Sequence, residues 1–123
     1  MPTELWKLPV SATALLKSPA FAALPKRRCE IFLKFEGHAG ARANVRLLFD
    51  GVEAFKCTYL TACSAEMFNT AYAKLVRLGI TPWLSELLKS YKGATPASGL
   101  QHLMICFDDG PCYEIVCAGF SVI

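Results

Sequence analysis

The stretch QHLMICFDDGPCYEIVCA, which runs from Gln101 to Ala118, decides the fold class because it holds two strand-like runs on either side of a turn signal. In both runs large or apolar residues occupy the odd-numbered positions: Leu103, Ile105, Phe107, Tyr113, Ile115 and Cys117. These residues share one face of an antiparallel pair only if the loop has an odd number of residues, since a slip by one would turn an apolar face to water. The segment Asp108-Asp109-Gly110 meets this condition, with Gly110 in the left-handed conformation of a type I turn plus G1 bulge. The stretch therefore predicts an antiparallel hairpin with Cys106 opposite Cys112.

Three further strands are predicted before this hairpin, in residues 28–36, 44–49 and 52–59. In the first of them apolar residues alternate with residues such as Glu30 and Lys34, and the segment Gly37–Gly40 ends the strand. The other two flank Asp50-Gly51 and are predicted to form a second hairpin. The positions of their apolar residues favour an odd loop or a bulge there over a two-residue turn.

The middle of the chain is predicted to be helical. Ser64 is a suitable N-cap, and apolar residues recur at three- and four-residue spacing from Met67 to Leu78, until Gly79 provides a stop. Thr81-Pro82 then reads as the N-cap and first residue of a shorter helix. Residues 93–99 form a loop rich in Gly, Ala, Pro and Ser, which we expect to be mobile.

The element order is therefore β-β-β-α-α-β-β, with strands grouped on either side of a helical middle. This order predicts an α+β fold with one antiparallel sheet of about five strands and two central helices packed on one face. Residues 1–27 contain four prolines and are expected to form an N-terminal arm with a short helix over Ser11–Lys17, while residues 28–123 form a single domain.

Composition and charge exclude several classes of protein. A chain of 123 residues fits one domain, and 54% hydrophobic against 19% charged residues is too apolar for a disordered protein. No apolar run approaches the ~18 residues of a spanning helix, so no membrane association is expected. The net charge of +3 is small, and its one cluster, Lys26-Arg27-Arg28, lacks interleaved aromatic residues, so nucleic acid is not the expected partner. The acid-free segment 5–29 matches a secretory signal or a transit peptide poorly, which favours a cytoplasmic protein.

Six cysteines raise the question of disulfides. Because most of them lie inside apolar runs and no export signal precedes them, all six are predicted to be reduced, as in cytosol. Cys106 and Cys112 are either two buried thiols or an oxidisable pair across the hairpin. The spacings match no usual zinc pattern, so neither a metal nor a cofactor is expected.

The residues most easily assembled into a polar cluster are His102, Glu114 and Cys106. In the predicted register His102 and Glu114 are diagonal neighbours on one face, and Cys106 would complete a Cys/His/acid group. A catalytic thiol needs a helix N-terminus or a cationic partner in a cleft, whereas Cys106 is predicted mid-strand, so no catalytic residue is assigned. His38, in its Gly-flanked loop, has no packing explanation.

Three segments resemble those of the YxiG-like family of small bacterial proteins: Phe49–Phe55, Thr81–Leu84 and His102–Glu114. The resemblance covers residues 29–120 and leaves the arm outside. It implies an uncharacterised family, some members of which are encoded near secreted polymorphic toxins, and it transfers no catalytic residue.

These observations lead to a non-enzymatic cytoplasmic binding protein, of the immunity or toxin-neutralising type that the resemblance implies. Its partner is expected to be a protein, such as a toxin domain, contacted through Trp6, Trp83, Arg27 and Arg28. A positive chain is unsuited to a basic nuclease target. The alternative is a small-ligand-binding or enzymatic α+β domain with a pocket near His102 and Glu114. A third possibility is a structural homodimer formed through an edge strand.

Overall fold

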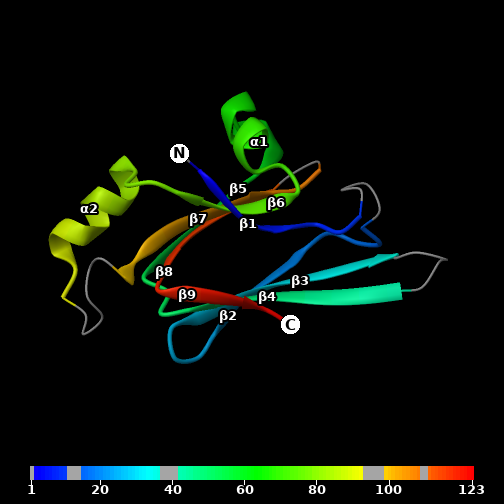
Figure 1. The fold of residues 1–123 in the computed structure, drawn as a ribbon, viewed down its shortest axis with the longest axis horizontal. Coiled ribbons are helices and arrows are strands. Elements are labelled where there is room, and N and C mark those ends of the chain that lie inside the picture. Colours follow the sequence, from blue (N-terminus) through cyan, green and yellow to red (C-terminus); the bar gives the residue numbers. More distant parts are fainter. Residues whose placement is uncertain (1, 11–14, 37–41, 93–98, 109–110) are drawn as a thin grey trace.

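The computed structural model describes residues 2–10, 15–36, 42–92, 99–108 and 111–123, which form two antiparallel sheets and two helices (Figure 1). The five-stranded sheet has the order β1 (Thr3–Lys7), β6 (Lys74–Leu78), β7 (Gln101–Cys106), β8 (Cys112–Cys117) and β5 (Ala54–Thr58). The four-stranded sheet has the order β2 (Ala20–Leu24), β3 (Arg28–Glu36), β4 (Arg42–Asp50) and β9 (Gly119–Val122). The helices are α1 (Ala65–Ala71) and α2 (Pro82–Ser90), and a 3-10 helix spans Leu60–Ala62. None of the described helices is long and apolar enough to cross a membrane.

The five-stranded sheet is the middle layer of the molecule. One of its faces packs on the four-stranded sheet, and the helices lie against the other face (Figure 1). The core between the sheets includes the following fully buried side chains from both of them: Ile31, Leu47, Phe49, Leu103, Ile105 and Ile115. The helical side adds two smaller clusters, one under α1 around Met104 and one under α2 around Val116. Because β7 and β8 are covered on both faces, they read as nearly continuous apolar runs.

The β7–β8 hairpin confirms the predicted register. Leu103 lies opposite Ile115, and Cys106 lies opposite Cys112. The N–H of Phe107 also donates to the carbonyl of Pro111 (3.4 Å). Asp109 and Gly110 are outside the described residues, so the left-handed turn stays a prediction. The same holds for the segment Gly37–Gly40 with His38 and for most of the loop over residues 93–99.

The chain is a mixed α+β fold as predicted, but it has two sheets in place of one, and the predicted strand order is wrong. The expected hairpin at Asp50-Gly51 does not form. Instead β4 pairs with β3 and β9, while β5 pairs with β8 in the other sheet. Gly51 has φ +61°, and Asp50 accepts a hydrogen bond from the N–H of Ala118 (3.0 Å). The β4–β5 and β8–β9 segments thus pass together from one sheet into the other, so Asp50-Gly51 forms a corner between sheets.

The long helix predicted from Ser64 to Gly79 is wrong in its second half. The side chain of Ser64 caps α1 as expected, accepting the N–H of Met67 (3.2 Å), but the helix ends at Ala71. Ala73 then adopts φ +57°, and β6 begins at Lys74. Leu75 and Val76 are both buried because β6 is an inner strand with a core on each face. Such a strand lacks the alternation of apolar and polar residues that indicates a strand. Its apolar residues instead continued the three- and four-residue spacing of the preceding helix, which is why the helix was predicted to be too long.

The first 27 residues contribute more regular structure than expected. β1 pairs with β6 and β2 pairs with β3, so each sheet gains an edge strand from this segment. The predicted short helix begins in residues 11–14, which lie outside the described part, and Leu15 forms a bridge with Phe35 in β3. The last strand, β9, was also not predicted. Edge strands need only a few residues and one partner, and short segments of this kind give little sequence signal.

Candidate functional site

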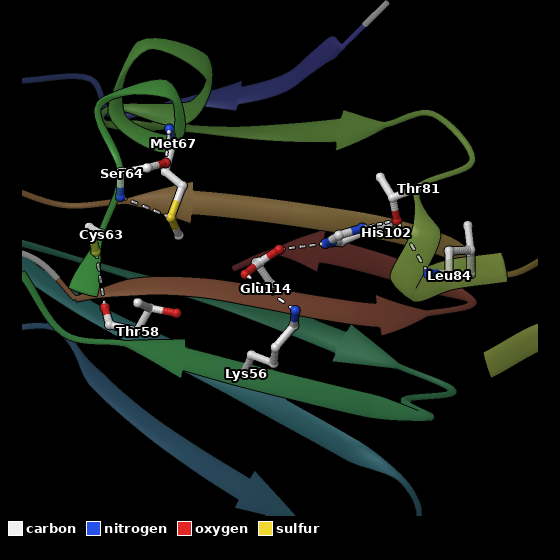
Figure 2. A network of polar contacts seen from close by, with 9 residues as sticks. All are labelled: Lys56, Thr58, Cys63, Ser64, Met67, Thr81, Leu84, His102 and Glu114. Carbon is white, nitrogen blue, oxygen red and sulfur yellow. Dashed lines mark hydrogen bonds and ion pairs between the residues drawn. The ribbon is translucent and has the colours of Figure 1, made fainter. Parts of the chain in front are cut away.

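A chain of polar contacts crosses the outer face of the five-stranded sheet in the space between the two helices (Figure 2). Thr81 Oγ1 lies 2.7 Å from His102 Nδ1, and His102 Nε2 lies 2.9 Å from Glu114 Oε1. Lys56 Nζ lies 4.0 Å from Glu114 Oε2. Two of these four residues, His102 and Glu114, were expected together from the sequence.

The strand register brings His102 and Glu114 together. His102 in β7 lies opposite Val116, and Glu114 in β8 lies opposite Met104, so the two side chains are diagonal neighbours on one face. Lys56 reaches the same face from β5, directly opposite Glu114. Within each strand, successive side chains point to opposite faces of the sheet. His102, Glu114 and Lys56 are on the face that points away from the core between the sheets.

Thr81 joins this group through the N-terminus of α2. Its Oγ1 accepts the N–H of Leu84 (3.2 Å), which is the expected N-cap bond. A neutral imidazole with its proton on Nε2 satisfies every partner, because the Thr81 hydroxyl then donates to Nδ1 and Nε2–H donates to Glu114. The helix end is therefore linked to the sheet through one histidine.

The surroundings favour an ionised Glu114. The hydrogen bond from His102 lowers the pKa of Glu114; burial opposes this shift, and the charge of Lys56 adds to it. Trp83 covers the group: its ring meets the ring of His102 edge-on with centroids 5.0 Å apart, and Lys56 Nζ lies 4.2 Å from its centroid. The side chain of His102 is only 3% exposed. The group is thus a compact and internally satisfied cluster.

A hydroxyl, an imidazole and a carboxylate in series are also the parts of a hydrolytic triad. Here the hydroxyl of Thr81 already holds the first turn of α2, and a nucleophile must also be reachable by a substrate. The carboxylate of Glu114 is more accessible than the imidazole of His102, and it lines a cavity of about 280 Å³ together with residues of α1 such as Met67 and Glu66. The geometry describes a structural clamp between α2 and the sheet, with one carboxylate facing a cavity.

Cys106 does not belong to this cluster. It lies at the far end of β7 beneath α1, where its Sγ donates to the carbonyl of Met67 (3.4 Å). Burial is the main reason that its pKa is raised to about 11. The Cys/His/acid group that the sequence allowed is therefore not assembled.

Of the four residues expected to contact a partner, the two tryptophans are half-buried and the two arginines already have a partner within the chain. Trp6 in β1 is half-buried and packs against the core between the sheets, and Trp83 is half-buried over His102. Arg27, at φ +57° in the β2–β3 turn, is ion-paired with Glu53. The Nε of Arg28 donates to the carbonyl of Pro25 (3.2 Å).

Sequence reasoning missed a group of exposed apolar side chains at the edge of the five-stranded sheet. Phe55 in β5 is 47% exposed, and Tyr59 and Leu60, just after β5, are 70% and 48% exposed. We call these three residues the β5 edge surface. The segment Phe-Lys-Cys-Thr-Tyr-Leu alternates like any half-covered strand, so the sequence gives no sign that its apolar residues reach solvent.

Comparison with known proteins does not add to this geometry: no family model matches the chain, and no curated protein and no solved structure matches it. The resemblance to YxiG-like proteins therefore stays an expectation from the sequence.

Proposed function

We propose that this chain is a non-enzymatic cytoplasmic binding protein, and that a partner protein adds an extended strand to β5. The observation that carries the proposal is the β5 edge surface, with Phe55 on the strand that ends its sheet and Tyr59 and Leu60 directly after that strand. Large aromatic side chains in such positions are typical anchors of protein interfaces. An edge strand also presents backbone groups that an added strand can pair with.

Aromatic rings of two other strands support Phe55 in the β5 edge surface. The ring of Phe55 lies 4.8 Å from that of Phe21 in β2, and Phe21 stacks on Tyr113 in β8 at 5.4 Å. The two edge strands β5 and β2 therefore lie on the same side of the molecule. A partner binding there meets a Phe55 ring that is already held in place, which reduces the entropy lost on binding.

The charges beside this surface favour an acidic partner strand. The Arg27 carbonyl accepts the N–H of Val52 (2.8 Å), so the basic β2–β3 turn with Lys26 lies at the start of β5. The side chains of Arg27 and Lys56 keep 52% and 46% of their surface exposed despite their ion pairs. Complementary charge on a partner would speed association and select against basic partners.

The resemblance to YxiG-like proteins suggests the class of partner, namely a toxin domain encoded in the same locus. The positive charge of the chain makes a basic nuclease an unsuitable target. This part of the proposal rests on the resemblance, whereas the position of the contact rests on the geometry of β5.

Two synthetic peptides test the contact. One alternates aromatic and acidic residues, and the other has each acidic residue replaced by lysine. We expect the acidic peptide to bind with one-to-one stoichiometry in calorimetry and to slow amide hydrogen exchange in residues 54–58. Tyr59→Ala and Leu60→Ala should each weaken binding by about tenfold, because truncating an interface anchor costs about 1–2 kcal/mol.

The matched control is Ile80→Ala, because Ile80 is equally exposed (73%) but follows β6, away from β5. It should leave the affinity unchanged. Equal binding of the lysine peptide, or slowed exchange in a different strand, would exclude the β5 contact. A stable dimer of the chain alone that Tyr59→Ala dissociates would show that a second copy occupies this edge.

The cavity beside Glu114 favours a second candidate function, a small-ligand-binding or enzymatic domain that uses His102 and Glu114. It predicts turnover of a generic ester, phosphodiester or peptide substrate, or saturable binding of a small molecule, that is lost in Glu114→Gln while circular dichroism shows an intact fold. The binding-protein proposal predicts no turnover in this screen.

A further inference from the structure

Three thiols meet at one end of the five-stranded sheet. Cys63 Sγ lies 3.3 Å from Cys112 Sγ, and Cys106 is directly opposite Cys112 in the β7–β8 register. Among the described residues no group of three or more Cys, His, Asp and Glu side chains is placed to hold a metal ion. Two thiols in contact, such as Cys63 and Cys112, can be oxidised to a disulfide.

The path of the chain after β5 creates this contact between residues 49 positions apart. Thr58 is the last residue of β5 and lies opposite Cys112 at the start of β8. The chain then turns through the 3-10 helix and returns toward α1, and the Sγ of Cys63 donates to the carbonyl of Thr58 (3.3 Å). Figure 2 shows Cys63 directed at Thr58 from the start of the α1 segment.

The three thiols differ in access to solvent. Cys106 and Cys112 are fully buried, whereas Cys63 is half-buried. An oxidant from solution therefore meets Cys63 first. Cys112 is already in contact with Cys63, and a thiol in that position can complete a disulfide.

We propose that Cys63 is an oxidation site, and that a peroxide converts Cys63 and Cys112 into a disulfide. The Cys63 thiolate attacks the O–O bond, forming a sulfenic acid and releasing water after proton uptake. The sulfur of Cys112 then attacks Cys63 Sγ, and the sulfenic oxygen leaves as water with the Cys112 proton. Two thiols and one hydrogen peroxide thus give one disulfide and two waters.

Closing this bond requires little movement. Disulfide sulfurs are about 2.0 Å apart, so the two Sγ atoms, now 3.3 Å apart, must approach by about 1.3 Å. Burial, followed by the adjacent Cys106 and Cys63 thiols, raises the pKa of Cys112. Cys112 is therefore poor at starting the reaction and acts as the second thiol. The bond would tie the segment that carries Tyr59 and Leu60 to β8.

The experiment uses the full chain with Cys57→Ser, because Cys57 is exposed and could link two molecules. In freshly purified, unoxidised protein that is unfolded in denaturant, we expect every cysteine to be alkylated without reductant, because the buried thiols are not accessible in the folded chain. After treatment with one equivalent of hydrogen peroxide, two thiols should be lost, and peptide mass spectrometry should find Cys63 linked to Cys112. Added dithiothreitol should restore both.

Two variants separate this assignment from its alternatives. Cys63→Ser should abolish the disulfide, and Cys106→Ala should retain it. A link between Cys106 and Cys112 in the parent protein, or full alkylation after peroxide, would overturn the proposal. Since Cys63 is half-buried, Cys63→Ser is expected to fold, and circular dichroism checks this.

Discussion

Glu114 shows how neighbouring groups change the ionisation of a side chain on the outer face of the five-stranded sheet. It lies between a hydrogen-bond donor, His102, and a cation, Lys56, and these two contacts outweigh the cost of its partial burial. The pKa of Glu114 is lowered as a result. Its charged form is therefore more stable in the folded chain than in the unfolded one.

This shift predicts a pH-dependent contribution to stability. A carboxyl group whose pKa is lower in the folded chain stabilises the fold above its unfolded pKa, and the contribution is lost as pH falls through the folded value. Glu114→Gln should therefore destabilise the protein near neutral pH, and its difference from wild type in free energy of unfolding should shrink as the pH falls below the ordinary glutamate pKa of about 4.3 toward the lowered folded value. Urea titrations over this range measure the difference.

Glu86→Gln is the control for this prediction. Among the described residues Glu86 pairs with Lys89 in an exposed i,i+3 contact, so Glu86→Gln should change the free energy of unfolding little over the same pH range. If the wild-type and Glu114→Gln curves stay parallel down to pH 3, Glu114 carries no such contribution.

At the scale of elements, Thr81, the N-cap of α2, makes two hydrogen bonds with different structural effects. Thr81 Oγ1 satisfies the N–H of Leu84 at the start of the helix, and it also holds His102 on the sheet. Ser64 makes the corresponding N-cap bond for α1. Both described α-helices thus have a capped start, and of these two it is α2 whose cap also contacts the sheet.

We expect Thr81→Ala to cost more than Ser64→Ala. Losing a cap costs about 1 kcal/mol, and in Thr81→Ala the buried Nδ1 of His102 also loses its partner, which adds about 1–2 kcal/mol. Thr81→Ser keeps the hydroxyl and should recover most of the loss. Chemical denaturation of the four proteins measures the order; equal losses in both alanine variants would show that the Thr81–His102 bond contributes nothing.

The joint between α1 and β6 is held in a strained conformation. Ala73 has φ +57°, its N–H donates to the carbonyl of Cys106 (2.7 Å), and its carbonyl accepts from Leu8 (2.9 Å). These two bonds connect α1 to β7 and to the N-terminal segment. They hold an alanine where glycine is usually found.

Ala73→Gly is therefore expected to raise stability slightly. Removing the left-handed strain gains about 1 kcal/mol, and the lost methyl contact and the freer unfolded chain offset part of it. Ala43→Gly, at a half-buried position inside β4, should instead lower stability by about 0.5–1 kcal/mol. Thermal unfolding compares the two variants, and a similar loss in both would contradict the strain at Ala73.

For the whole molecule, the corner at Gly51 decides how the two sheets are joined. Both the positive φ of Gly51 and its close approach to Ala118 require a residue without a Cβ there. A Cβ at this position would lie 2.8 Å from the Cβ of Ala118, on the second segment that crosses between the sheets. The corner therefore depends on two crossing segments that fit each other.

Gly51→Ala should destabilise the whole fold by about 1–3 kcal/mol, because it combines left-handed strain with overpacking. Gly119→Ala is the matched control, since a Cβ there meets nothing within 4 Å. Adding Ala118→Gly to Gly51→Ala should recover the part due to the clash. Equal unfolding midpoints for Gly51→Ala and Gly119→Ala would show that the corner is not tightly packed.

The sequence by itself determined the features that depend on neighbouring residues. The register of the β7–β8 hairpin follows from alternation on both sides of a short loop, and it already makes His102 and Glu114 diagonal neighbours. The two caps, Ser64 and Thr81, follow from side-chain hydrogen bonds to backbone groups three residues away. These interactions are local, so their signal is present in the order of residues.

Only the tertiary structure decided which strands lie side by side. Asp50-Gly51 suits a tight hairpin as well as a corner, and the choice depends on β8 and β9, which come about 60 residues later. The same distant pairing makes Leu75 and Val76 part of an inner strand, brings Cys63 to Cys112 and leaves β5 at an edge. Burial by a partner far along the chain outweighs local preference, because covering apolar surface on both faces contributes more free energy than helix propensity does.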